Sequence, residues 1–183
     1  MTIFPFNKGD QSDRRFEEML RPLVSHLYRL AYRFCGHQDD AEDLVQDVLT
    51  KLYTLKEEMF RVDSLKPWVS KVLYHHFVDQ ARKQRRSPIA LMDEPFAIDD
   101  APMQGEHQPD HYLERDQEMS HVERAYHQLT DEHRAVIALH DIEGYPLNEI
   151  VVILDIPLGT LKSRLHRARA RLKELLEFQY DKN

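Results

Sequence analysis

The segment that most constrains this chain lies near its carboxyl end, where residues 144–169 read as two helices joined by a tight turn. Apolar residues fall where two crossed helices would bury their contact, at Ile150, Leu154, Ile156, Leu161 and Leu165. Asp155 stands at the turn, where a short polar side chain tolerates a left-handed backbone. Pro157 then fixes the backbone just before the second helix. The segment therefore predicts a helix-turn-helix, a motif whose second helix enters the major groove of DNA.

The second helix of this motif is apolar on one side and basic on the other. Residues 158–173 include six lysines or arginines and no acid. The side away from the apolar stripe carries Thr160, Lys162, Ser163, Arg164, His166 and Arg167. Lysine and arginine neutralise phosphates, and arginine also pairs with a guanine edge, so we expect these six residues to contact duplex DNA. The alternative is a basic helix that packs on an acidic partner.

A net charge of −7 is unusual for a DNA-binding protein, but the acids are concentrated in one segment. Residues 87–120 contain nine acids and a single base, and prolines recur at positions 88, 95, 102 and 109. Because local charge decides affinity for nucleic acid, the rest of the chain remains suited to DNA. We expect a flexible acidic linker over residues 87–117, with a structured acidic loop as the alternative.

The remaining sequence is helical in pattern, with only five glycines and no sustained strand-like alternation. It predicts an all-α fold of two small helical domains, residues 1–86 and 118–183, joined by the linker. In the first domain we expect helices over 13–34, from Asp39 or Asp40 to 55, and over 67–86, with Gly36 ending the first. Thr130 or Asp131 is expected to cap a helix in the second domain.

Eleven histidines invite a metal-dependent hydrolase as a rival interpretation. The chain has no His-Glu-x-x-His, no glycine-rich phosphate loop, no Gly-x-Ser-x-Gly and only one cysteine. These absences predict a protein that is not an enzyme and has no metal and no cofactor. The amino end lacks a signal pattern and no apolar run is long enough to span a membrane, so we expect a cytoplasmic protein without membrane insertion.

The helix expected to end at residue 86 mixes aromatic rings with bases. Rings beside cations suit single-stranded DNA, because unstacked bases lie on the rings while cations follow the backbone. We expect Trp68 and Phe77 to be partly in the core. The candidates for contact with a single strand are Tyr74, His75 and His76, whose rings we expect to be exposed, with the basic residues Arg82 and Lys83. A helix that only serves the core is the alternative.

The helix expected to end at residue 55 has an outer face that is acidic and rich in hydrogen-bonding groups. That face includes Asp43, Gln46 and Asp47. Such a face is usually only solvated, but it also suits a basic partner protein.

Two motifs together resemble a known family. They are the run from Asp40 to Tyr53, and the run from Leu129 through the helix-turn-helix to Arg169, with its Gly-Thr-x-Lys-Ser-Arg-Leu-x-Arg-Ala-Arg pattern. Both are similar to those of bacterial RNA polymerase sigma factors of the extracytoplasmic-function (ECF) group. The resemblance covers roughly residues 16–86 and 118–177.

The resemblance implies a protein that binds core RNA polymerase and directs promoter-specific transcription initiation. The first domain would bind the β′ clamp helices through Asp43, Gln46 and Asp47, and would capture the −10 strand with residues 61–76, followed by Arg82 and Lys83. The second domain would dock on the β flap and read the −35 element. An anti-sigma factor would be a further partner. The rival is a stand-alone helix-turn-helix regulator.

Overall fold

The computed structural model of the chain describes residues 11–86 and 121–180, without the side chains at 84–86 and 179–180. Within these two ranges every regular element is a helix, and the predicted all-α class is confirmed. The predicted linker over residues 87–117 lies outside the described residues.

The amino-terminal half is a bundle of helices. Its elements are α1 (Gln11–Leu20), the short 3₁₀ helix η1 (Arg21–Leu23), α2 (Val24–Cys35), α3 (Gln38–Thr54), α4 (Lys56–Met59) and α5 (Leu65–Arg86). The prediction of one continuous helix over 13–34 is wrong, because η1 interrupts it at Pro22. Proline has no N–H to donate and its ring crowds the preceding turn, so a regular α-helix cannot run through it undisturbed.

The predicted end of α2 is confirmed at Gly36, which adopts a left-handed backbone with φ 88°. The predicted cap of α3 is wrong. His37 holds the cap position with an extended backbone and no side-chain hydrogen bond, and Asp39 and Asp40 instead lie in the first turn. Acids there still interact favourably with the positive end of the helix dipole.

The carboxyl-terminal half begins with a helix over residues 121–127. It continues with α7 (Asp131–Ile137), the π-helical turn η3 (Ala138–Ile142), α8 (Leu147–Leu154) and α9 (Leu158–Tyr180). Thr130 caps α7, since its side chain accepts a hydrogen bond from the His133 backbone N–H. Asp155 adopts the expected left-handed conformation, with φ 55°, and turns the chain between α8 and α9. The predicted helix-turn-helix is therefore present.

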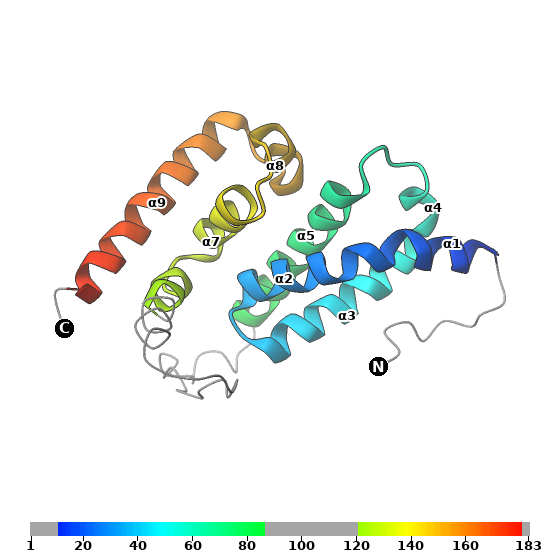
Figure 1. Cartoon of the computed structure of the whole chain (residues 1–183), viewed down its shortest axis with the longest axis horizontal. Helices are drawn as coiled ribbons and strands as arrows, with labels where there is room; N and C mark the ends of the chain where they lie inside the picture. Colours follow the sequence, from blue (N-terminus) through cyan, green and yellow to red (C-terminus); the bar gives the residue numbers. More distant parts are fainter. Residues whose placement is uncertain (1–10, 87–120, 181–183) are drawn as a thin grey trace, which may run out of the picture.

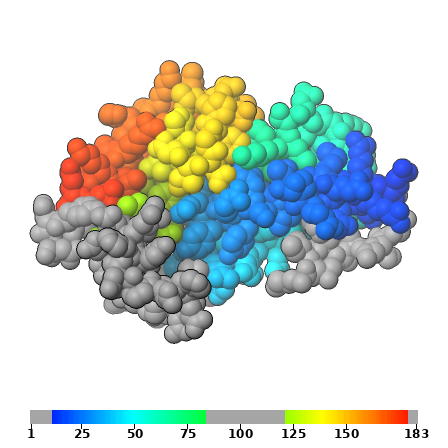
Figure 2. All heavy atoms as spheres, viewed as in Figure 1, coloured from blue at the N-terminus to red at the C-terminus, as the bar shows by residue number. Residues whose placement is uncertain are grey.

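The two halves pack against each other (Figure 1). Helix α8 lies against α5, while α2 contacts both α7 and η3. In the space-filling view the segments around residue 140 meet the α2 and α5 segments directly (Figure 2). The buried apolar residues form one cluster that includes Phe34, Leu73, Leu139 and Ile150, and so runs through both halves.

Candidate nucleic-acid interface

Helix α9 presents the polar face that its sequence predicts. Leu161, Leu165 and Ala168 are buried against the rest of the carboxyl-terminal half, which fixes the rotation of the helix. The opposite side exposes five of the six predicted DNA contacts, namely Thr160, Lys162, Ser163, His166 and Arg167. The remaining bases farther along α9 pair with carboxylates, as Arg169 does with Asp141 at 3.0 Å. Positive charge is therefore available chiefly at the amino-terminal end of the helix, the part that a helix-turn-helix inserts into the major groove.

Arg164 differs from the other five. Its guanidinium pairs with the Glu132 carboxylate of α7 at 2.9 Å, and only 15% of its side chain is exposed. His133 lies nearby, and burial, together with Arg167 and Arg164, lowers the pKa of its imidazole. Contact of Arg164 with DNA would therefore require its guanidinium to leave the Glu132 carboxylate. The role of Glu132 was not predicted, since nothing in its local sequence shows which basic side chain it faces.

The ring of Tyr74 is not where the sequence analysis expected it. Tyr74 on α5 is only 7% exposed and packs edge-on against Phe34, with ring centroids 5.9 Å apart. Burial accordingly raises the pKa of its phenol. The expectation of an exposed ring is wrong for this arrangement, because the carboxyl-terminal half covers α5. Phe77 is buried and Trp68 is half-buried, as predicted.

The other residues predicted to contact the −10 strand point in different directions. His75 is half-buried, and its Nε2 has no hydrogen-bond partner among the described atoms. His76 turns toward α3, where its Nε2 lies 3.3 Å from an Asp47 carboxylate oxygen. Arg82 and Lys83 are exposed at the carboxyl end of α5. The five residues therefore do not form one continuous surface in this arrangement.

The predicted polymerase-binding residues share one exposed face of α3. Asp43, Gln46 and Asp47 are all exposed, which agrees with the expected helix rotation. Asp47 also accepts a hydrogen bond from the Gln80 side-chain amide at 2.9 Å. Asp47 thus links α3 to α5, whereas Asp43 is not part of that contact.

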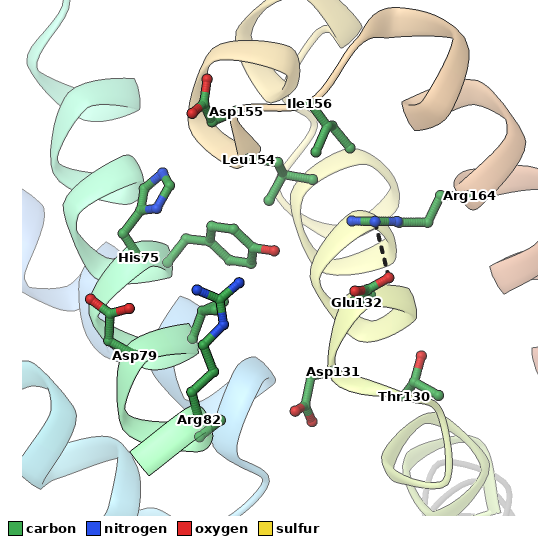
Figure 3. A pocket seen from close by; sticks show the side chains of 13 residues that line it. His75, Asp79, Arg82, Thr130, Asp131, Glu132, Leu154, Asp155, Ile156 and Arg164 are labelled. Atoms are coloured by element: carbon green, nitrogen blue, oxygen red, sulfur yellow. Dashed lines mark ion pairs between the residues drawn. The ribbon is translucent and has the colours of Figure 1, made fainter. Parts of the chain in front are cut away.

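Residues from both predicted DNA-binding surfaces meet in one cleft of about 640 Å³ (Figure 3). The α5 side of the cleft is formed by residues that include Tyr74, His75 and Arg82. Arg164 lies on the opposite side with Glu132. Arg164 is therefore the one predicted −35 contact that faces α5 across this cleft.

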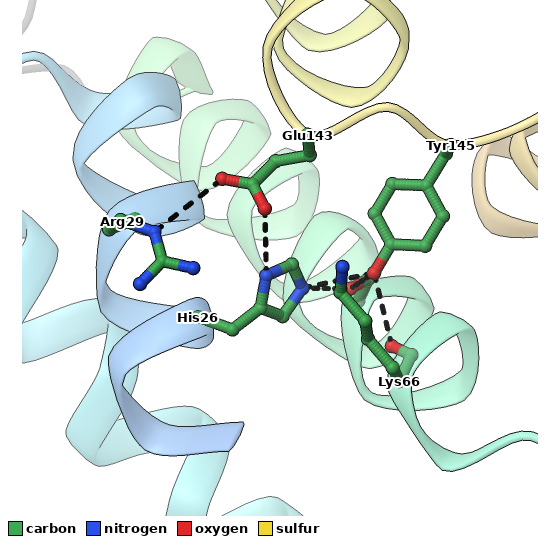
Figure 4. Close-up of polar contacts among 6 residues, drawn as sticks. His26, Arg29, Lys66, Glu143 and Tyr145 are labelled. Carbon is green, nitrogen blue, oxygen red and sulfur yellow. Dashed lines mark hydrogen bonds and ion pairs between the residues drawn. The ribbon is translucent and has the colours of Figure 1, made fainter. Parts of the chain in front are cut away.

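A second polar site also joins the two halves and was missed in the sequence analysis. His26 of α2 is only 4% exposed and lies between Glu143 and Tyr145, which follow η3 (Figure 4). The burial of His26 could have been predicted from the sequence, because this residue falls inside the apolar stripe of its helix beside Leu27 and Leu30. Its partners could not be found in the same way, since Glu143 is 117 residues away.

Among residues 11–86 and 121–180, no three histidine, cysteine or acidic side chains gather in a way that could hold a metal ion. No helix in those ranges is long and apolar enough to cross a membrane.

Sequence comparison places these features in a known family. The profile described as Sigma-70 region 2 matches residues 19–87, and the profile described as Sigma-70, region 4 matches residues 121–172. The ECF RNA polymerase sigma factor SigE of Mycolicibacterium smegmatis is 32% identical over 173 residues, which cover 92% of this chain and 64% of SigE. RNA polymerase sigma factor SigV of Bacillus subtilis is 30% identical over 142 residues, covering 78% of this chain and 79% of SigV. The chain belongs to the ECF sigma factors of bacterial RNA polymerase.

A solved structure resembles the sigma factor over most of its length. The sigma factor RpoE of Bartonella quintana, crystallised with the anti-sigma factor NepR, is 28% identical with a TM-score of 0.69. The match covers 90% of this chain and 98% of RpoE, and so includes both halves. As a sigma factor, the protein binds core RNA polymerase and directs promoter-specific transcription initiation.

Proposed function

We propose that this sigma factor reads the −35 element of its promoters with the exposed face of α9. The observation that carries the proposal is the rotation of α9, which buries Leu161 and Leu165 and leaves Lys162 and Arg167 exposed at the inserting end. In this assignment Arg164 leaves Glu132 and donates to a base edge, while Lys162 neutralises a phosphate.

The same proposal assigns the amino-terminal half to polymerase and to the melted −10 strand. Asp43, Gln46 and Asp47 bind the β′ clamp helices through the exposed face of α3. Tyr74 and His75 stack on unpaired bases once α5 is uncovered, and His76, Arg82 and Lys83 complete that contact. The proposal includes the division of the chain into an amino-terminal domain (residues 1–86), an acidic linker (87–117) and a carboxyl-terminal domain (118–183).

The role of a sigma factor also implies further binding partners and no catalytic activity of its own. The polymerase makes and breaks the bonds, so the sigma factor acts as a binding protein without a cofactor, in the cytoplasm where core polymerase works. The carboxyl-terminal half also docks on the β flap. An anti-sigma factor is proposed as its inhibitor, in view of the NepR complex of the related RpoE.

The −35 assignment is tested by replacing Arg164 with alanine and transcribing a set of promoters with single changes in the −35 element. If Arg164 reads a base edge, the variant loses about 1–3 kcal/mol of binding free energy and its preference at one base pair. The matched control is Lys162→Ala on the same helix face. It should weaken all promoters alike and reduce the salt dependence of binding.

Two results would contradict the proposal. A uniform loss in the Arg164→Ala protein would assign that residue to phosphate. Failure of the protein to co-purify with core polymerase, combined with specific binding to a palindromic site, would instead favour a stand-alone helix-turn-helix regulator.

A further inference from the structure

The polar site between the halves is a closed hydrogen-bonded cluster of His26, Ser70, Glu143 and Tyr145. His26 Nδ1 lies 3.0 Å from Glu143 Oε2, and its Nε2 lies 2.9 Å from Ser70 Oγ and 3.0 Å from the Tyr145 hydroxyl. The Ser70 and Tyr145 hydroxyls are 2.8 Å apart. These residues come from α2, α5 and the segment between η3 and α8, so the cluster joins both halves (Figure 4).

The hydrogen-bonding pattern requires the two halves to be together. A carboxylate accepts only, so His26 donates from Nδ1 to Glu143. Nε2 of the neutral ring then accepts from the Ser70 or Tyr145 hydroxyl, and the tautomer follows from these partners. Separation of the halves removes Glu143 and Tyr145 from His26 and Ser70 at the same moment. The cluster is therefore specific to the closed arrangement.

Positive charge around the cluster also depends on the closed arrangement. Arg29 Nε of α2 lies 3.7 Å from the second carboxylate oxygen of Glu143. Lys66 Nζ lies 4.8 Å from the centre of the Tyr145 ring, within the range of a cation–π contact. Both cations belong to the amino-terminal half and both of their partners to the carboxyl-terminal half. They add attraction across the same contact.

The residue types in this cluster also resemble those of a hydrolytic active site. Ser70, His26 and Glu143 follow the nucleophile, base and orienting-acid order of serine hydrolases. Ser70 has no exposed surface, however, and Tyr145 is only 4% exposed beside it. A substrate cannot reach the Ser70 hydroxyl in this arrangement. The cluster is better explained as a contact that holds the halves together.

A second contact between the halves lies at the other end of α2. The Tyr126 hydroxyl donates to the Arg33 carbonyl oxygen at 3.2 Å, and His127 packs edge-on against Tyr32 with ring centroids 6.4 Å apart. The close approach is also visible at Gly36, where an added Cβ would lie only 2.8 Å from His127 Nδ1. This seam is formed largely by packing. The four-residue cluster instead joins the halves through several buried side-chain hydrogen bonds.

The closed arrangement conflicts with simultaneous contact to both promoter elements. The position numbers of the −10 and −35 elements place them roughly 25 base pairs apart, which is roughly 85 Å of duplex at ~3.4 Å per base pair. Tyr74 and Arg164 are assigned to those two elements, yet they line the same cleft. The two halves must therefore separate before both elements are bound.

We propose that the cluster of His26, Ser70, Glu143 and Tyr145 is an intramolecular latch that holds the free sigma factor closed, with the strand-binding face of α5 covered, and that its release accompanies binding to core polymerase. The statement that the covered face of α5 binds a strand rests on the proposed assignment of α5 to the −10 element. The closed–open equilibrium itself is a property of the free protein.

The latch is tested by Tyr145→Phe, which keeps the ring and removes the hydroxyl. Spin labels at Glu57→Cys and Ala170→Cys, both exposed sites, report the distance between the halves in a Cys35→Ala background. Loss of the hydroxyl bonds should raise the open fraction about five- to tenfold. The matched control is Tyr53→Phe, which removes a hydroxyl bond to Asp13 inside the amino-terminal half and should leave the distances unchanged.

Glu143→Gln serves as a second latch variant, in case Tyr145→Phe impairs folding. Circular dichroism and thermal unfolding identify a protein that has lost its helices. An unchanged distance distribution in a folded latch variant would overturn the proposal.

A second measurement separates the latch from the proposed function. The opened variants should bind core polymerase about five- to tenfold more tightly than the parent, because less free energy is needed for opening. Opening without tighter binding would overturn the link to polymerase. The holoenzymes formed by the parent and by the variants are also tested for protection of a pre-melted −10 strand. If none of them protects it, the assignment of α5 to that strand is wrong. The spin-label distances test the latch independently of that result.

Discussion

At the residue scale, the helix-turn-helix depends on the backbone of Asp155. This is the one residue other than glycine with a positive φ among the described residues, at 55°. A left-handed conformation costs an ordinary L-residue roughly 1–2 kcal/mol, while asparagine, aspartate and glycine adopt it more readily. The carboxylate therefore has a conformational role at the turn, independent of its charge.

Substitutions at Asp155 should separate conformation from charge. We expect Asp155→Ala to lower the free energy of unfolding by about 1 kcal/mol, because alanine tolerates the left-handed backbone less well than aspartate or glycine does. Asp155→Asn and Asp155→Gly should remain within about 0.5 kcal/mol of the parent. Urea unfolding followed by circular dichroism measures all three. Equal losses in the three variants would show that the negative charge matters instead.

At the scale of the element, α3 has a buried apolar side and an exposed polar side, and the polar side is the one proposed to bind polymerase. Its apolar side buries Leu44, Val48 and Leu52 in the bundle, and its polar side remains in solvent. Asp47 also hydrogen-bonds to Gln80 of α5, so a change at Asp47 affects packing as well as surface charge. Asp43 is the cleaner probe of this face.

Charge reversal at Asp43 should weaken binding to core polymerase about tenfold or more, because a like charge then faces a basic partner. The fold should be unaffected, since Asp43 is exposed. Glu18→Lys, at an exposed position on α1, is the matched control and should bind as the parent does. Affinity measured by fluorescence anisotropy compares them. Equal affinity for Asp43→Lys and Glu18→Lys would exclude this face of α3.

At the scale of the whole molecule, two histidines are enclosed by the contact between the halves. Burial is the largest cause that lowers the pKa of His26; Lys66 and Arg29 lower it further, while Glu143 raises it. Burial also lowers the pKa of His127 to about 4, with added effects of neighbouring cations that include Arg134 and Arg33. Both rings are therefore neutral in the closed arrangement at neutral pH.

This enclosure predicts that acid opens the protein. Separation of the halves returns both histidines toward their ordinary pKa of about 6.5, so the open state binds more protons below that pH. The closed state is thus fully favoured above about pH 6.5 and loses stability as the pH falls toward 4. The spin-label distances at pH 8 and pH 5.5 should show this opening, and His26→Gln should reduce its pH dependence. Distances that do not respond to pH would contradict the prediction.

The sequence by itself predicted the all-helical class, the turn at Asp155, and a cap at Thr130 or Asp131, of which the structure has Thr130. These features depend on residues a few positions apart, through the 3.6-residue period and local turn chemistry. It also placed the exposed faces of α3 and α9, because each has an uninterrupted apolar stripe. It failed at Pro22, where a single residue without an N–H interrupts the apolar pattern of a longer helix.

Only the tertiary structure decided how the two halves meet. That contact buries Tyr74, holds Arg164 in a shared cleft and joins His26 to a carboxylate 117 residues away. No local pattern encodes these partners, since they depend on which surfaces of two separately patterned halves bury each other. The sequence therefore predicted candidate residues for contact with DNA and polymerase, and these remain predictions. The packing of the halves decided which of them are accessible in the closed protein, because burial is a property of the whole fold.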